Sequence, residues 1–189
     1  MSVVFVTGNA GKLRETNHIL ADTGIELTSH KLDLEETQGT IDEVSIAKAK
    51  AAAKILGKPV LVEDTALGFA ALKGLPGVYI KWFLDSLGHE GLNKMLAGFE
   101  DKSATAWCTF AYCGGPDEDV LLFQGTCDGT IVPPRGENNF GWNAVFEPKG
   151  FTETFAEMSE ETKNSISHRF KALEKLKVFL AEKKAEESQ

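Results

Sequence analysis

The chain has 189 residues, of which 42% are hydrophobic and 25% are charged, an ordinary balance for a soluble globular protein. This length indicates one domain, or two small lobes around one core. Its 28 acidic and 20 basic residues give a formal net charge of −8, which argues against a broad phosphate-attracting surface and a general nucleic-acid binder.

Cysteine usage indicates a reducing compartment, and neither the cysteines nor the histidines form a zinc motif. The three cysteines, Cys108, Cys113 and Cys127, form no Cys-x-x-Cys pair, which argues against a disulfide framework and a structural zinc site. The histidines form no His-Glu-x-x-His motif, so catalytic zinc is not expected either. No apolar run approaches the roughly 20 residues that span a bilayer, and Met1 leads into a strand-like run rather than a cleavable signal. We therefore expect a cytoplasmic protein without a membrane partner.

Strand and helix signals alternate along the first part of the chain. We expect strands at 3–6, about 25–32 and 59–62, and helices at about 12–22 and 42–56. The second helix ends at Gly57 before Pro59, a usual C-terminal signal. The third strand is apolar on both faces, so it predicts a buried central strand that ends at Glu63-Asp64.

The second half begins with a Gly/Pro loop at 73–78 and a helix at about 80–96. Strands at 104–113 and 120–127 flank the turn at 114–117 and predict an antiparallel hairpin. Residues 129–164 are expected to be mostly irregular, followed by a helix at about 165–184 and a frayed tail. No repeat or linker marks a second domain, so we predict a single α/β domain over 1–189 with a mixed sheet.

The segment Thr7-Gly8-Asn9-Ala10-Gly11-Lys12 lies where a strand leads into a helix. Backbone N–H groups and the helix N-terminus can receive phosphate oxygens at such a point, and Lys12 would add a positive charge. The segment is not a P-loop, because Val6 stands where the first glycine belongs and Leu13 follows the lysine. A simple turn with a surface lysine is the alternative.

Lys48 falls in the apolar stripe that Val44, Ala51 and Ile55 form on the helix predicted at 42–56. Its ammonium group must extend to solvent along its long stem, pair with a carboxylate, or face a bound anion. The sequence leaves these alternatives open.

Two acidic pairs could hold a metal ion. Glu63 and Asp64 follow the buried strand and point to opposite faces, so only one of them can face a given ligand. Glu35 and Glu36 form the second pair, in a loop. Carboxylates from separate loops together with phosphate oxygens make a normal Mg²⁺ site, although each pair alone also fits a solvated face or a cap.

Aromatic and basic side chains mark the last third of the chain. Phe140 and Trp142 flank Gly141, so one ring could support a planar base, although core packing also explains both rings. The run 163–169 is expected to open the final helix and to offer Lys163, His168 and Arg169 to a ligand. Asn164 as a plain helix N-cap is the alternative. Separated cations, acidic loops and an aromatic surface in an acidic protein together suit a nucleoside polyphosphate with Mg²⁺.

These residues resemble the inosine triphosphate pyrophosphatase family over nearly the whole chain. The resemblance lies in Phe-Val-Thr-Gly-Asn-Ala-Gly-Lys at 5–12, Val-Leu-Val-Glu-Asp-Thr at 60–65, Gly-Leu-Pro-Gly-Val-Tyr-Ile-Lys-Trp-Phe at 74–83, Phe-Gly-Trp at 140–142 and Lys-Asn-Ser-Ile-Ser-His-Arg at 163–169. Residues 96–102 are similar to the eukaryotic branch. The resemblance implies an elongated mixed sheet, two lobes with a nucleotide cleft between them, and a homodimer. It further implies hydrolysis of ITP, dITP and XTP to the monophosphate and pyrophosphate.

The resemblance also assigns roles to residues. It implies that Mg²⁺, or alternatively Mn²⁺, binds to Glu36 and Asp64, which are catalytic together with Lys12. The residues implied to bind the phosphates are Thr7, Gly8, Asn9, Ala10, Gly11, Lys12, Lys48 and Lys81. Asp64 and Thr65 are also implied to bind the substrate. Those implied to bind the base are Phe140, Gly141, Trp142, Asn143, Lys163, His168 and Arg169.

Asn143 departs from the family pattern, in which an Asp usually follows the Trp. Asparagine is nearly isosteric with aspartate but carries no charge and can donate hydrogen bonds. We expect altered base selectivity with retained hydrolysis. The alternative is a nucleotide-binding protein of the same fold whose catalysis is weak or lost owing to Asn143.

Overall fold

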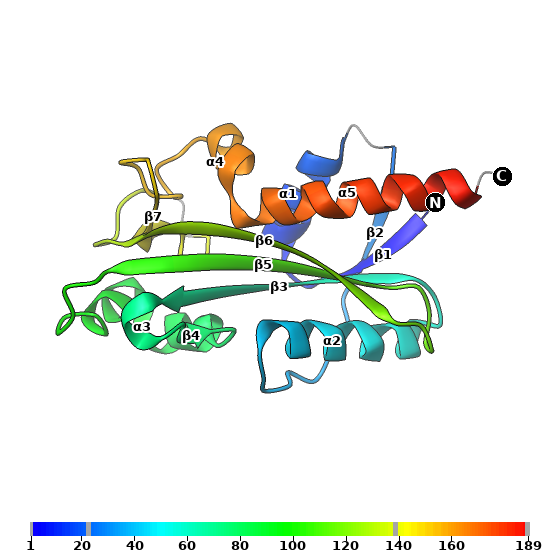
Figure 1. Cartoon of the computed structure of the whole chain (residues 1–189), viewed down its shortest axis with the longest axis horizontal. Coiled ribbons are helices and arrows are strands. Elements are labelled where there is room, and N and C mark those ends of the chain that lie inside the picture. The colour runs from blue at the N-terminus through cyan, green and yellow to red at the C-terminus, as the bar shows by residue number, and fades with distance from the viewer. Residues whose placement is uncertain (1, 22–23, 138–139, 188–189) are drawn as a thin grey trace. The chain divides into compact units, whose positions relative to one another are not determined.

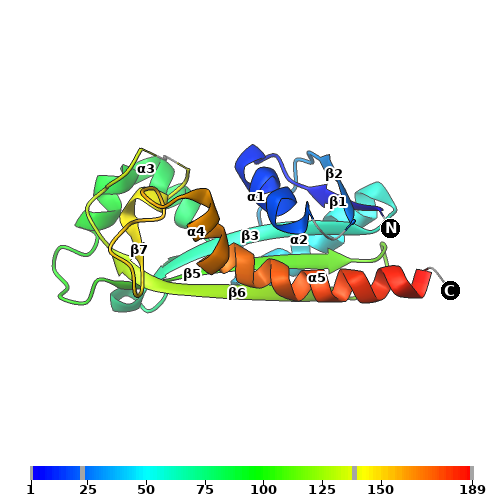
Figure 2. The same cartoon turned by 90° about the horizontal axis from the view of Figure 1, so that it is seen from above.

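The computed structural model describes residues 2–21, 24–137 and 140–187, and its strands form one mixed sheet (Figure 1). The strands are β1 (Ser2–Val6), β2 (Glu26–His30), β3 (Val60–Phe69), β4 (Pro76–Gly77), β5 (Ser103–Cys113), β6 (Val120–Ile131) and β7 (Phe146–Pro148). Their order is β2-β1-β3-β5-β6-β7, with β4 paired to β3. β1 pairs in parallel with β2 and β3, whereas β4 and β7 pair antiparallel with β3 and β6. Figure 2 shows β1 and β2 side by side, next to the helix that follows β1.

The helices are α1 (Ala10–Leu20), α2 (Ile41–Leu56), α3 (Ile80–Lys94), α4 (Glu160–Ile166) and α5 (His168–Glu187), with 3-10 turns η2 (Ala70–Leu72) and η3 (Asn143–Val145). The predicted α/β class with a mixed sheet is therefore confirmed. Among the described residues, no helix is both long enough and apolar enough to cross a membrane.

The chain forms two compact units. Unit 1 comprises 1–64, 108–125 and 169–189, and unit 2 comprises 65–107 and 126–168. β3, β5 and β6 each contribute residues to both units. The single-domain organisation and the nucleotide cleft stay predictions.

Strand alternation in unit 1 supplies two separate apolar faces. Side chains at alternate positions of β1, β3 and β5, among them Phe5 and Leu61, pack with α1 and α5 in one core cluster. The intervening positions, among them Val4 and Val62, pack with α2 in another cluster. Figure 1 accordingly shows α5 and α2 on opposite sides of these strands. Consecutive residues in the unit 1 part of β3 are thereby divided between the α1/α5 side and the α2 side.

α2 is defined by strong end signals. Thr40 and Glu43 form a reciprocal capping box at its start, and Gly57 ends it in the left-handed conformation at φ 63°. The predicted apolar stripe through Lys48 is wrong, because Ile55 is 60% exposed. The buried face of α2 is rotated about the helix axis by almost one residue position from the predicted stripe. It consists mainly of small side chains, which let the helix approach the sheet closely. The buried residues are Val44, Ser45, Ala49, Ala52 and Ala53.

Three predicted boundaries are wrong. β3 does not end at Glu63-Asp64 but continues to Phe69, because apolar residues continue on both faces after Asp64. α1 begins at Ala10 rather than Lys12, since Asn9 is its N-cap. The segment 129–164 is also less irregular than expected, because β6 extends to Ile131 and this segment contains β7 and most of α4.

The final helix likewise differs from its prediction. Residues 160–166 form the separate helix α4, which Ser159 caps by accepting a hydrogen bond from the Thr162 amide. Asn164 therefore lies inside α4 and is not an N-cap. Ser167 is extended, with φ −66° and ψ 159°, and α5 begins at His168.

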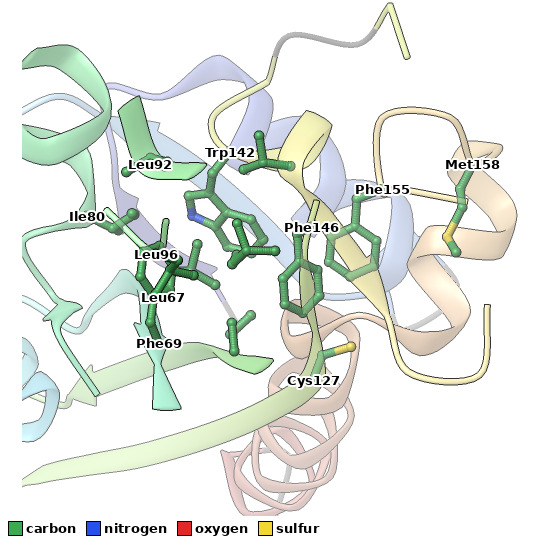
Figure 3. Packing of buried hydrophobic residues seen from close by; sticks show 14 residues of the cluster. Leu67, Phe69, Ile80, Leu92, Leu96, Cys127, Trp142, Phe146, Phe155 and Met158 are labelled. Atoms are coloured by element: carbon green, nitrogen blue, oxygen red, sulfur yellow. The ribbon is translucent and has the colours of Figure 1, made fainter. Parts of the chain in front are cut away.

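Unit 2 has its own core, which joins α3 to the segment around β7. Trp142, Phe146 and Phe155 lie in it together with Leu92 of α3 (Figure 3). The Trp142 and Phe146 rings meet edge to face with centroids 5.2 Å apart. This core fixes the position of Trp142.

Candidate nucleotide site

Glu63 and Asp64 are consecutive on β3, and their side chains serve different faces of the sheet, as predicted. Glu63 lies on the same side as Leu61, toward α1 and α5. Asp64 lies on the side of α2, where its Oδ1 accepts a hydrogen bond from Lys48 Nζ at 2.6 Å. Each carboxylate therefore belongs to a different group of charges.

The first group is a buried charge network around Glu63, whose side chain is completely shielded from solvent. Glu63 Oε1 lies 3.4 Å from Arg169 Nη2 at the start of α5, and Glu63 Oε2 lies 3.1 Å from Lys12 Nζ on α1. Arg169 Nη1 also pairs with Glu15, and the Cys108 thiol donates to Glu63 Oε1 at 3.3 Å. Two carboxylates thus hold Arg169 in place.

The network determines the protonation of two of its members. Burial opposes the charge on Arg169, but the negative charges of Glu63 and Glu15 outweigh it and raise the pKa of the guanidinium above its usual value. Burial, and next the charge of Glu63, raise the pKa of the Cys108 thiol well above its usual value. Arg169 is therefore a cation and Cys108 a neutral donor at physiological pH.

The second group is the Lys48–Asp64 pair, whose side chains are 20% and 14% exposed. Among the described residues, Asp64 Oδ2 has no hydrogen-bond partner although it is shielded from solvent. Of the three alternatives for Lys48, the structure shows pairing with a carboxylate. Glu36 is exposed in the segment before α2.

The start of α1 is built by short-range hydrogen bonds. Asn9 Oδ1 accepts from the Lys12 amide at 3.1 Å, and Thr7 Oγ1 accepts from the Asn9 amide at 3.1 Å. A side chain at Gly8 would meet Lys31 at 3.3 Å. Ala10, Gly11 and Lys12 form the first turn of the helix, so the N-terminal positive end of α1 begins inside the segment predicted to bind phosphate.

Unit 2 contains most of the residues that were predicted to bind the base, whereas Arg169 belongs to unit 1 and to the Glu63 network. Trp142 is only 7% exposed and lies 5.3 Å from the His168 ring. Phe140 is half-buried, and Lys163 Nζ lies 5.7 Å from the centre of its ring. Trp142 is therefore a core residue, whereas Phe140 is the more accessible of the two rings.

The remaining predicted residues occupy varied places. Asn143 is buried in η3, and its Nδ2 has no hydrogen-bond partner among the described residues. Thr65 follows Asp64 on β3 and is half-buried. Lys81 is exposed in the first turn of α3, with Nζ 6.0 Å from the centre of the Trp82 ring.

Sequence reasoning missed two residues of the Glu63 network, namely Glu15 and Cys108. Glu15 stands three residues after Lys12, a spacing that places both side chains on one face of α1. Cys108 alternates with Phe110 along β5, toward the same face as Glu63. The hydrogen bond between Cys108 and Glu63 joins residues 45 positions apart, which no local pattern reveals.

The sequence and the fold both resemble those of known proteins. The profile of the Ham1 family matches residues 3–179, and the chain belongs to this family. The chain is 96% identical to the inosine triphosphate pyrophosphatase of Yarrowia lipolytica, over 100% of both chains. It is 62% identical to the inosine triphosphate pyrophosphatase of Batrachochytrium dendrobatidis, covering 96% of this chain and 95% of that protein. The solved structure of a HAM1 protein from Coxiella burnetii is similar with a TM-score of 0.87 and 33% identity, over 96% of this chain and 99% of the other.

Proposed function

We propose that the chain is a nucleoside triphosphate pyrophosphatase that hydrolyses ITP, dITP and XTP to the monophosphate and pyrophosphate. In this role it clears deaminated purines from the nucleotide pool. The curated relatives support the reaction, because they are named for it. The observation that carries the proposal is the environment of the Asp64 carboxylate. Its Oδ1 accepts a hydrogen bond from Lys48, and its Oδ2 is shielded from solvent and has no hydrogen-bond partner among the described residues.

Asp64 and Glu36 fit Mg²⁺, with Mn²⁺ as the alternative. Mg²⁺ prefers oxygen ligands and is usually held by one or two carboxylates together with substrate phosphates and water. The unpartnered Oδ2 of Asp64 is such an oxygen, and the exposed Glu36 can supply a second one. No cluster of three metal-binding side chains occurs among the described residues, and this mode of binding needs none. When bound, the ion would neutralise phosphate charge and polarise the α-phosphoryl group.

The chain's own residues bind and orient the triphosphate. Lys12 and Lys48 supply positive charge, and the N–H groups at the start of α1 donate hydrogen bonds to phosphate oxygens. Lys81, farther along the chain, is assigned to the same polyphosphate. Water attacks the α-phosphorus, the bond from that phosphorus to the oxygen bridging to the β-phosphate breaks, and pyrophosphate leaves. Positioning and charge neutralisation supply most of the rate in such a step.

Base recognition is assigned to the residues around Phe140 and Trp142. Arg169, which the resemblance also assigns to the base, already has Nη1 on Glu15 and Nη2 on Glu63. Lys163 and His168 donate hydrogen bonds toward the purine, which favours the 6-oxo acceptor of hypoxanthine or xanthine. Adenine presents an amino donor there and would leave these donors unpaired. We further propose a homodimer and a cytoplasmic location, both on the family resemblance.

Asp64→Asn tests the proposal directly. We expect ITP turnover to fall at least a hundredfold while ITP binding is partly retained, because the amide keeps the shape of the side chain but loses its charge. Asp85→Asn, at an exposed position of α3, is the matched control and should leave turnover unchanged. Unchanged turnover in Asp64→Asn would show that the carboxylate is not catalytic.

The alternative function is nucleotide binding with weak or lost catalysis. It is favoured by one observation, the buried Asn143 amide without a partner for Nδ2 among the described residues, where the family usually has a carboxylate. Binding of ITP by the wild-type chain without release of pyrophosphate would establish this alternative.

A further inference from the structure

α3 is not a continuous helix. Gly88 has φ 68° and ψ −179°, a conformation that interrupts the helix between Leu87 and His89. A Cβ atom at Gly88 would meet no atom within 4 Å, so it is the backbone conformation that favours glycine there. The break gives the segment from His89 to Lys94 a direction of its own.

This second segment of α3 carries two side chains that hold the backbone before Trp142. His89 Nε2 lies 2.8 Å from the carbonyl oxygen of Gly141, which can only accept, so the ring nitrogen donates. Asn93, one turn later, donates from Nδ2 to the Val132 carbonyl at 2.8 Å and to the His89 carbonyl at 3.3 Å. The two side chains therefore hold the chain at residue 132 and again at residue 141.

Gly141 links the residues that carry two aromatic rings, Phe140 and Trp142. Gly141 has φ 57°, a conformation that other residues rarely adopt, and the Asn143 amide donates to the Phe140 carbonyl at 3.2 Å, which closes a turn over 140–143. Trp142 is fixed in the core, which also contains Leu92 of the same α3 segment (Figure 3). Phe140 is half-buried and is not in that core cluster. Its ring lies 5.7 Å from Lys163 Nζ, and the Gly141 peptide sets its direction relative to Trp142.

We propose that His89 is a positioning residue for base recognition: its hydrogen bond to the Gly141 carbonyl fixes the peptide between Gly141 and Trp142, and with it the turn that presents Phe140. Asn93 supports it by holding the other end of the segment. The inference rests on the proposed function insofar as Phe140 contacts the purine. His89 touches neither the phosphates nor the reacting atoms in this account, so its removal should affect base binding alone.

The test compares the binding of IMP, which carries a base, with the binding of inorganic pyrophosphate, which has none. His89→Phe keeps a flat ring but removes the donor, and we expect it to raise the KM for ITP and the Kd for IMP about fivefold. Neither kcat nor the Kd for inorganic pyrophosphate should change more than twofold. His89→Gln retains a donor and should restore at least half of the loss. His18→Phe, at an exposed position of α1, is the matched control.

The binding measurements need no turnover, so they separate the two proposals. A wild-type chain that does not hydrolyse ITP would overturn the proposed function, while the ratio of IMP to pyrophosphate binding still tests His89. Equal weakening of IMP and pyrophosphate in His89→Phe would overturn the positioning role and indicate a general structural one. Unchanged IMP binding would overturn it as well.

Discussion

Replacing Glu63 by glutamine should destabilise the protein far more than the corresponding change at its neighbour Asp64. Glu63 is fully shielded and lies between Arg169 and Lys12. Glutamine keeps the shape but removes the negative charge, so a buried guanidinium loses one of its two carboxylates. Removing one partner of a buried ion pair is costly because it leaves the other charge without compensation.

The size of the effect can be worked from these contacts. Breaking a buried pair costs about 3–5 kcal/mol. Arg169 retains Glu15, and the Lys12 side chain is 20% exposed and can reach water, so we expect the low end, about 3 kcal/mol. The Lys48–Asp64 pair is more exposed, and Asp64→Asn should cost about 1 kcal/mol. For a chain of this length each kcal/mol lowers Tm by about 2–4 °C, which gives about 6–12 °C for Glu63→Gln and about 2–4 °C for Asp64→Asn.

Thermal unfolding followed by circular dichroism measures both variants against the wild type. Glu63→Gln is expected to have the lower Tm of the two. The reasoning would be refuted if Asp64→Asn were the less stable variant, or if Glu63→Gln lowered Tm by less than about 3 °C, near 1 kcal/mol.

Two substitutions and one labelling experiment test other parts of the account. Lys12→Ala should weaken ITP binding about tenfold or more and IMP binding much less, because the triphosphate carries more charge toward Lys12; equal losses in titration calorimetry would refute its phosphate role. Asn143→Asp should change kcat/KM for ITP by less than a hundredfold, since the wild-type amide supports hydrolysis in this account; a larger gain would show that the carboxylate is required. Cys108, Cys113 and Cys127 are all buried, and burial together with Glu63 raises the pKa of Cys108, so that its thiol stays protonated at pH 8. A disulfide reagent should label no thiol of the native protein at this pH and all three after unfolding; prompt native labelling of Cys108 would contradict its burial.

Local patterns predicted the element types well and the contacts between distant elements poorly. The alternation along β3 was sufficient to separate Glu63 from Asp64, because strand geometry sends consecutive side chains to opposite faces. The buried face of α2 was misjudged because the packed residues are alanines, whereas the large Ile55 faces solvent. Apolar size was therefore a misleading guide on a helix that packs close to a sheet.

In the candidate site, too, local patterns were informative and contacts between distant elements were not foreseen. The sequence left three alternatives open for Lys48, and the structure shows pairing with Asp64. The pairing of Arg169 with Glu15 and Glu63 joins α5 to α1 and β3, which depends on tertiary packing and leaves no local signal. The roles of the other site residues toward the nucleotide and the metal ion stay predictions.

The reaction itself is tested most directly by product analysis. The wild-type chain is incubated with ITP, GTP or ATP in the presence of Mg²⁺, and pyrophosphate is resolved from orthophosphate. The account predicts IMP and pyrophosphate from ITP, with little product from ATP, whose 6-amino group leaves the donors unpaired. Little product is also expected from GTP, whose rejection must come from its 2-amino group because guanine shares the 6-oxo group. Orthophosphate as the first product, or equal turnover of ATP and ITP, would contradict it.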